Sequence, residues 1–153
     1  MKAAGVRPRM AARMTSLSTL VVDDEQKICA LLQQWLTGAG HTAVTAHSGI
    51  DACAAMKERR FDLVITDVLM PDGDGLDLIT ELKKVQPRAR ILAMSGGGRY
   101  VESDDYLKLA QGIGAHAAVM KPFDWKQLQA AIELALVAPP ARAWAGAGAR
   151  SAA

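Results

Sequence analysis

The sequence predicts an α/β fold built on a five-stranded parallel sheet with helices on both faces. Five short apolar stretches alternate with stretches of helical period, which is the pattern of repeated βαβ units. Four of these apolar stretches run directly into a carboxylate, a hydroxyl or an ammonium side chain. Ligands of open parallel sheets bind at the carboxyl ends of the strands. The polar side chains are therefore expected to meet at one edge of the sheet.

Short apolar runs bounded by polar or turn residues predict the five strands. In chain order they are residues 17–22, 41–46, 63–66, 90–94 and 116–120.

Five helices are predicted between and after the strands. In chain order they are residues 25–37, 49–59, 75–85, 103–111 and 124–138. Apolar residues at helical spacing mark the first, and two glycines end it. Ser48 and Asp124 are the expected N-caps of the second and the last helix. Pro87 ends the third, and Gly112 or Gly114 caps the fourth.

One domain, residues 17–138, is expected between two short tails. A chain of 153 residues is about one domain long and can bury a core. Residues 1–16 are basic and contain no acidic residue, which predicts a disordered arm; Met10 and Met14 are alternative starts. Residues 139–153 have low complexity and predict a disordered tail.

The formal net charge of +2 conceals an acidic core. All 16 acidic residues lie between Asp23 and Glu133, whereas six of the 18 basic residues lie in the tails. Residues 14–138 therefore carry 12 basic and 16 acidic side chains, a net charge of −4. This balance argues against direct nucleic-acid binding. No apolar run approaches the roughly 20 residues of a membrane span, so a cytoplasmic location is expected.

The cysteines and histidines show no metal-site spacing. Cys29 and Cys53 lie within apolar helical patterns, which predicts buried free thiols in a reducing compartment. His41, His47 and His116 are expected at the surface or at the edge of the sheet.

The candidate site consists of the polar residues at four strand ends: Asp23 with Asp24, then Asp67, Ser95 and Lys121. Three carboxylates crowded at one edge repel one another and take up protons unless a cation neutralises them. Mg²⁺ is the natural cation, because it is hard and is usually held by one or two carboxylates with waters and phosphate oxygens. A carboxylate can also attack a phosphorus atom held in line and form an acyl phosphate, and Asp67 is the best candidate nucleophile.

These motifs also stand in the order, and nearly at the spacing, of a known family. They are an acidic pair, a lone aspartate before Met70-Pro-Asp-Gly, a serine and Lys121-Pro-Phe. Over residues 17–137 the chain resembles the receiver domain of two-component response regulators, the CheY-like superfamily. The resemblance implies a doubly wound (βα)5, flavodoxin-like fold with sheet order 2-1-3-4-5, and a cis Lys121–Pro122 bond.

The resemblance also implies a role for each site residue. Asp67 would accept the phosphoryl group, and Asp24 and Asp67 would bind Mg²⁺ directly. Asp23 would assist through a water molecule, and the backbone carbonyl of Leu69 would complete the protein ligands. Lys121 and the Ser95 hydroxyl would each contact a phosphoryl oxygen. The metal-binding residues implied are thus Asp23, Asp24, Asp67 and Leu69, and the catalytic residues are Asp67, Lys121 and Ser95.

The function implied is that of a stand-alone, single-domain response regulator. A histidine kinase or a histidine phosphotransfer protein would supply the phosphoryl group. Output would be a protein–protein contact or onward phosphotransfer, with no direct DNA binding and no membrane insertion. Dimerisation on activation is left open. The chain would not be an enzyme beyond Mg²⁺-dependent self-phosphorylation and autodephosphorylation.

The sequence departs from the family pattern in three places. Ala118 occupies the position of a switch tyrosine or phenylalanine, which puts the usual coupling in doubt. The loop at residues 96–102 is longer than common, and we expect it to replace the aromatic switch with Tyr100 or Tyr106. Leu69 and Gly97 line the approach to the acyl phosphate in the family pattern, and neither has a polar side chain that could orient an attacking water. This predicts a long-lived phosphoryl state.

The residues also bear on two rival functions and on the class of dinucleotide-binding proteins. Ala118 motivates a receiver-fold binding module that acts independently of phosphorylation. A Mg²⁺-dependent phosphatase of the haloacid-dehalogenase type needs a second aspartate where Leu69 stands. Dinucleotide binding is excluded because the first strand is followed by Asp-Asp-Glu and not by a glycine-rich turn.

Overall fold

The computed structural model of the chain describes residues 15–70, 75–96, 108 and 110–139. Several expectations concern residues outside these ranges. They are the basic arm before Thr15, the turn after Met70, the glycine loop after Gly96 with its two tyrosines, and the tail from Pro140 onward.

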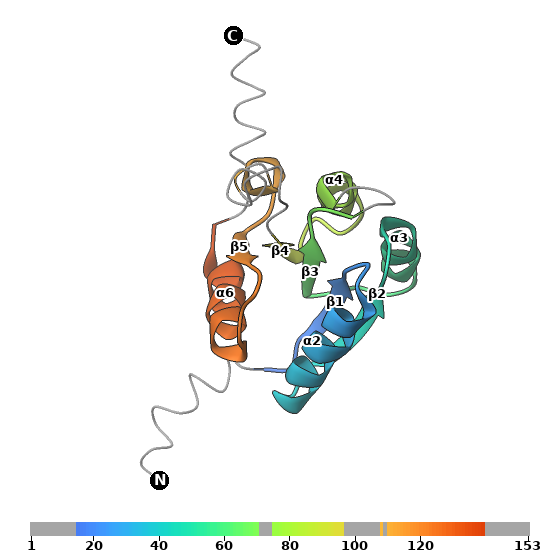
Figure 1. Cartoon of the computed structure of the whole chain (residues 1–153). Helices are drawn as coiled ribbons and strands as arrows, with labels where there is room; N and C mark the ends of the chain where they lie inside the picture. The colour runs from blue at the N-terminus through green and yellow to red at the C-terminus, as the bar shows by residue number, and fades with distance from the viewer. Residues whose placement is uncertain (1–14, 71–74, 97–107, 109, 140–153) are drawn as a thin grey trace.

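The five strands form one parallel sheet of order β2-β1-β3-β4-β5, as predicted. The strands are β1 (Ser18–Val22), β2 (Thr42–Ala46), β3 (Leu63–Asp67), β4 (Arg90–Ser95) and β5 (Ala117–Met120). The helices are α2 (Gln26–Gly38), α3 (Gly49–Glu58), α4 (Gly75–Val85) and α6 (Trp125–Val137). Residues 110–113 are also helical, and the predicted start of that helix lies outside the described ranges. Figure 1 shows α2 and α6 on one side of the sheet and α3 and α4 on the other.

The helices cover both faces of the sheet, so alternate residues of the central strands enter two separate cores. Leu20 of β1 packs with α3 and α4, whereas its neighbour Val21 packs with α2 and α6. Val64 and Ile65 of β3 divide in the same way. This two-sided burial explains why the strands read as continuous apolar runs rather than as alternating patterns.

Local sequence signals set the ends of the helices as predicted. The Ser48 hydroxyl accepts the backbone N–H of Asp51 and caps α3. Asp124 forms a reciprocal capping box with Gln127 at the start of α6. Gly114, with φ of +141°, ends the helical turn at residues 110–113 in a conformation that favours glycine.

Two histidines directly precede the edge strands β2 and β5, which agrees with the expected edge positions, and both are engaged there rather than free at the surface. His41 is 7% exposed, and its Nδ1 accepts the backbone N–H of Leu17 at 3.0 Å. His116 is half-buried, and its Nδ1 accepts the backbone N–H of Ile91 at 3.0 Å. Strands β2 and β5 each begin directly after their histidine, one residue later than the apolar pattern predicted.

We expect His116 to make the folded state less stable at mildly acidic pH. Burial, together with the charges of Arg90 and Lys83, lowers its pKa from 6.5 to about 4. Between pH 6.5 and pH 4 this histidine is therefore protonated in the unfolded chain but neutral in the folded chain. The free energy of unfolding consequently falls as the pH drops from 6.5 toward 4. After allowance for its partial exposure, the loss is about 1–2 kcal/mol.

The measurement compares urea unfolding of wild type and His116→Asn across this pH range. Asparagine retains an acceptor for the Ile91 N–H but does not titrate. The variant should lose less stability on acidification than wild type does, although burial also lowers the pKa of His41, which remains in both proteins. Parallel pH profiles for the two proteins would contradict this account.

Candidate functional site

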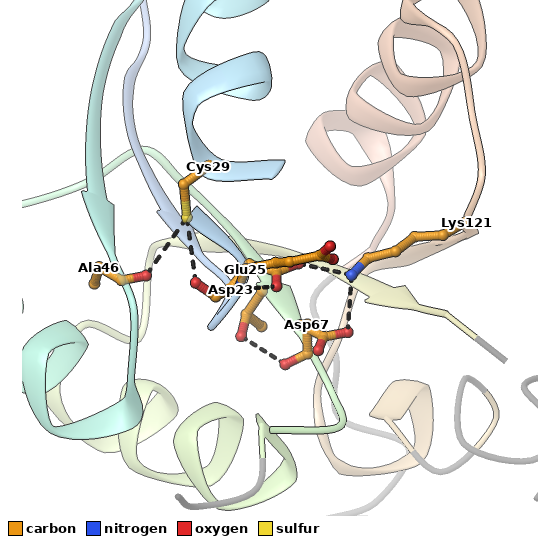
Figure 2. Close-up of polar contacts among 7 residues, drawn as sticks. Asp23, Glu25, Cys29, Ala46, Asp67 and Lys121 are labelled. Carbon is orange, nitrogen blue, oxygen red and sulfur yellow. Dashed lines mark hydrogen bonds and ion pairs between the residues drawn. The ribbon is translucent and has the colours of Figure 1, made fainter. Parts of the chain in front are cut away.

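The structure brings the predicted carboxylates and the lysine to one edge of the sheet. Asp23 and Asp24 directly follow β1, Asp67 ends β3, and Lys121 directly follows β5. Ser95 ends β4, and its backbone carbonyl accepts the N–H of Lys121 at 2.8 Å. Figure 2 shows the side chains of Asp23, Asp67 and Lys121 converging at this edge.

Three carboxylates lie close enough together to share one cation. Oxygen atoms of Asp23, Asp24 and Asp67 all lie within 4.8 Å of one another. Asp23 and Asp67 are 1% and 4% exposed, whereas Asp24 is exposed. Two of the three charges are therefore removed from water, which makes their mutual repulsion strong.

Lys121 is the cation that the described residues supply to this cluster. Its Nζ lies 2.7 Å from Oδ2 of Asp23, a charge-assisted hydrogen bond, and 3.6 Å from Oδ1 of Asp67, an ion pair. Burial lowers the pKa of Lys121, but the hydrogen bond to Asp23 and the charges of Asp67 and Asp23 outweigh burial and raise it above its usual value. The lysine is therefore charged, and its shorter contact is with Asp23.

Asp67 is left as the under-compensated member of the cluster. Burial raises its pKa to about 6; the Lys121 charge lowers it, while Asp23 and Asp24 raise it further. Its Oδ1 atom is buried and makes no hydrogen bond within the described part of the chain. The Oγ atom of Ser95 is buried and unpartnered in the same sense. A buried polar atom without a partner is costly, so both atoms fit a site that gains a ligand.

Two contacts that the sequence pattern did not indicate hold Asp23 in place after β1. The N–H of Glu25 donates to Oδ1 of Asp23 at 2.9 Å. The thiol of Cys29 lies 3.3 Å from the carbonyl of Asp23 and 3.7 Å from that of Ala46, as Figure 2 shows. Burial, reinforced by Asp23, raises the pKa of this thiol to about 11, so it stays protonated and can donate. The helical pattern around Cys29 indicated burial but gave no sign of this partner.

Both cysteines are free, but the predicted burial holds in full for one of them. Cys29 is buried, whereas Cys53 is half-buried on α3.

A cluster of aromatic rings holds the loop that carries Lys121. The ring of Trp35 on α2 lies 6.4 Å from that of Phe123 and 6.1 Å from that of Trp125, centroid to centroid. Tilted ring pairs at such distances stabilise a contact beyond the area they bury. The Lys121–Pro122 peptide bond in this loop is cis, as the resemblance implied.

Three further predicted positions lie near the site. Met70 is 7% exposed and belongs to the core against α3 and α4. Leu69 is 37% exposed, and the role of its carbonyl as a metal ligand stays a prediction. Ala118 is half-buried and packs against the same core, where a larger switch residue was expected from the family pattern.

The residues present fit a divalent cation of the hard, oxygen-binding kind. The cluster offers oxygen donors only, two of them buried, and one of its buried oxygens lacks a hydrogen-bond partner. Carboxylate oxygens are the ligands that Mg²⁺ selects in proteins.

The sequence model of the response regulator receiver domain matches residues 19–133. The chain belongs to this family. It is 38% identical over 137 residues to the DNA-binding transcriptional regulator NtrC of Azospirillum brasilense, covering 88% of this chain and 28% of that protein. It is also 38% identical over 120 residues to the transcriptional regulatory protein ZraR of Salmonella typhimurium, covering 78% of this chain and 26% of that protein. The chain thus spans about a quarter of the length of these regulators.

Solved structures agree with the family assignment. A receiver domain protein from Clostridium thermocellum superposes with a TM-score of 0.69 at 31% identity, covering 78% of this chain and 93% of that one. The beryllofluoride-activated NtrC4 receiver domain dimer gives a TM-score of 0.70 at 33% identity, covering 78% and 95%. Within the described ranges of our chain, no helix has the length and apolar character that crossing a membrane requires.

Proposed function

We propose that the domain receives a phosphoryl group on Asp67 and signals through that modification. The observation that carries the proposal is the state of this carboxylate. It is 4% exposed, one of its oxygens makes no hydrogen bond, and it lies beside two further carboxylates and one ammonium group. Family membership supplies the class of reaction, and this geometry supports Asp67 as the acceptor.

In the proposed reaction, an Asp67 oxygen attacks the phosphorus of the donor. A bond forms between that oxygen and phosphorus, the bond from phosphorus to the donor's leaving group breaks, and the leaving group departs with the electron pair. Asp24 and Asp67, with Asp23 and the Leu69 carbonyl, would hold Mg²⁺, which when bound neutralises charge on the oxygens of the transferring group.

Lys121 and Ser95 stabilise the product through their own polar atoms. The Lys121 ammonium already lies 3.6 Å from Asp67 and can follow the charge onto a phosphoryl oxygen. The Ser95 hydroxyl is buried and unpartnered and can donate to another such oxygen. Because both groups are held by neighbouring strand ends, little reorganisation is needed when the group arrives.

A histidine kinase or histidine phosphotransfer protein is the proposed donor, and the cytoplasm the proposed location. The proposed output is a protein–protein contact or onward phosphotransfer, without direct DNA binding by this domain. The beryllofluoride-activated NtrC4 receiver domain is a dimer, which supports dimerisation on phosphorylation as a form of output here. The single-domain organisation stays a prediction from the sequence.

Intact-mass analysis after incubation with acetyl phosphate tests the proposal. With Mg²⁺ present we expect the mass of the chain to rise by one phosphoryl group, and with EDTA in its place we expect no change. Equal labelling in the two conditions would contradict the role of the acidic cluster as a metal site.

Ala118 favours one alternative, a binding module of receiver fold that does not respond to phosphate. This residue leaves β5 without the side chain that the family uses to couple its site to its surface. The same mass experiment separates the alternatives, because the module predicts no phosphoryl adduct in either condition.

A further inference from the structure

The edge of the sheet opposite the candidate site carries a concentration of basic side chains. We call this set the basic edge. Its members lie in the last turns of α3 and α4, in the loops that follow them and at the first residue of β4: Lys57, Arg59, Arg60, Lys83, Lys84, Arg88 and Arg90. The stretches 57–62 and 83–90, which hold all seven, contain two acidic residues, Glu58 and Asp62. The chain is therefore polarised, with carboxylates at one end of the strands and basic groups at the other.

None of the seven basic side chains forms an ion pair with a carboxylate among the described residues. The ion pairs in which both partners are described residues are those of Lys121 at the opposite edge. The carboxylate of Asp62 is engaged by the backbone N–H of Ser18 at 2.8 Å. Basic residues in a last helical turn are favoured by the helix dipole, which accounts for Lys57 and for the two lysines of α4. The helix dipole does not account for the arginines in the loops.

These arginines line a groove between the end of α3 and the loop between α4 and β4. The groove has a volume of about 680 Å³, and four basic residues, Lys57, Arg59, Arg60 and Arg88, lie along it together with one acidic residue, Glu58. All four side chains are exposed and can turn toward a ligand. Helices α3 and α4 lie side by side on this face of the sheet, as Figure 1 shows.

The amide side chain of Gln86 ties the two walls of the groove together. Its Nε2 donates to the carbonyls of Met56 and Arg59 at 2.9 and 2.8 Å. Its Oε1 accepts the N–H of Phe61 at 2.8 Å. One residue of the loop after α4 thus satisfies three backbone groups at the end of α3. The groove is consequently preformed, which reduces the entropy lost on binding.

We propose that the basic edge is a docking surface for an acidic segment of a partner protein. The guanidinium of Arg90 donates to the Ala138 carbonyl at 2.8 Å, and that of Arg59 lies 5.8 Å from the centre of the Phe61 ring. Exposed cations that form no ion pair, clustered along a preformed groove, recognise a run of Asp or Glu side chains through charge-assisted hydrogen bonds. Single-stranded nucleic acid fits less well, because it uses exposed aromatic rings for base stacking, and Phe61, the aromatic residue of this edge, is 4% exposed. The net charge of −4 over residues 14–138 also opposes an extended polyanion more than a short acidic segment.

The test measures binding of a fluorescein-labelled oligoglutamate peptide to the full chain at low ionic strength by fluorescence anisotropy. The variant Arg60→Glu with Arg88→Glu reverses two charges of the groove. The matched control, Lys27→Glu with Lys126→Glu, makes the same change in net charge at exposed positions near the starts of α2 and α6, at the opposite edge. We expect saturable binding that the groove variant weakens about tenfold or more and the control changes by less than about twofold.

Several outcomes would overturn the proposal. Equal weakening by the two double variants would mean that net charge alone attracts the peptide, through the basic arm or any other part of the chain. Absence of saturable binding, or tighter binding of an oligothymidylate of the same charge, would also overturn it. Thermal unfolding of both double variants verifies that they fold. If the charge-reversed pair does not fold, the neutral pair Arg60→Gln with Arg88→Gln replaces it in the binding measurement. The neutral pair should weaken binding less than charge reversal, and unchanged binding would overturn the proposal.

Discussion

Replacing Asp67 by asparagine is expected to make the metal-free domain more stable while it abolishes phosphoryl acceptance. The folded-state pKa of Asp67 is about 6, above the ordinary 3.8, chiefly because the carboxylate is buried. Ionisation therefore costs the folded state free energy, and this cost grows as the pH rises from 3.8 to 6 and is complete above that range. A shift of about two pKa units, which already includes the attraction to Lys121, corresponds to about 3 kcal/mol at most. We expect a net gain of about 1–3 kcal/mol in the free energy of unfolding at pH 7.5.

Urea unfolding in EDTA gives the measurement, with Asp23→Asn as its control. Asp23 accepts the 2.7 Å hydrogen bond from Lys121, so its replacement leaves the lysine poorly paired and should lower stability. Added Mg²⁺ should stabilise wild type more than Asp67→Asn, since ligands that bind only the folded state raise its apparent stability. A loss of stability in metal-free Asp67→Asn would contradict the picture of an under-compensated carboxylate.

Replacing Lys121 by methionine is expected to damage both stability and phosphoryl transfer. The ammonium is the cation that pairs with Asp23 and Asp67 in the described residues, and its side chain is 17% exposed. Removing one partner of a buried ion pair leaves uncompensated charge, which costs about 3–5 kcal/mol in buried cases and about 2–4 kcal/mol at this exposure. Without the ammonium, the product loses one of its stabilising contacts, and we expect the phosphoryl group to be acquired at least about tenfold more slowly.

Two measurements separate these effects. Unfolding in EDTA reports the stability loss, and the time course of intact mass with acetyl phosphate and Mg²⁺ reports the rate. Lys126→Met serves as the control, because it removes an exposed lysine of α6 near the same edge. Transfer at the wild-type rate by the Lys121 variant would remove this residue from the proposed mechanism.

The fold and most of the site could be predicted because both depend on local signals. Helical spacing, N-caps and apolar runs gave the elements, and the polar residue that follows each strand gave the edge at which the carboxylates and Lys121 meet. Ser95 lies at the same edge, but its hydroxyl makes no hydrogen bond within the described residues.

The supporting contacts could not be predicted, because they join residues far apart in the chain. Trp35 had the pattern of an ordinary core residue of a helix, and nothing local indicates that its ring meets Phe123 and Trp125. The ring nitrogens of His41 and His116 accept backbone N–H groups from distant parts of the chain, a use of histidine that hydrophobic periodicity does not indicate.

The measurement that tests the central claim most directly locates the phosphoryl group on the chain. Because three aspartates lie within 4.8 Å of one another, the mass of the intact protein does not tell which one is modified. Borohydride reduces an acyl phosphate to the alcohol, so a phosphorylated aspartate becomes homoserine and can be found by peptide mass spectrometry. We expect homoserine at position 67 after treatment with acetyl phosphate and Mg²⁺, and unmodified aspartate at positions 23 and 24. Homoserine at either of those two positions, or at none, would contradict the assignment of Asp67 as the phosphoacceptor.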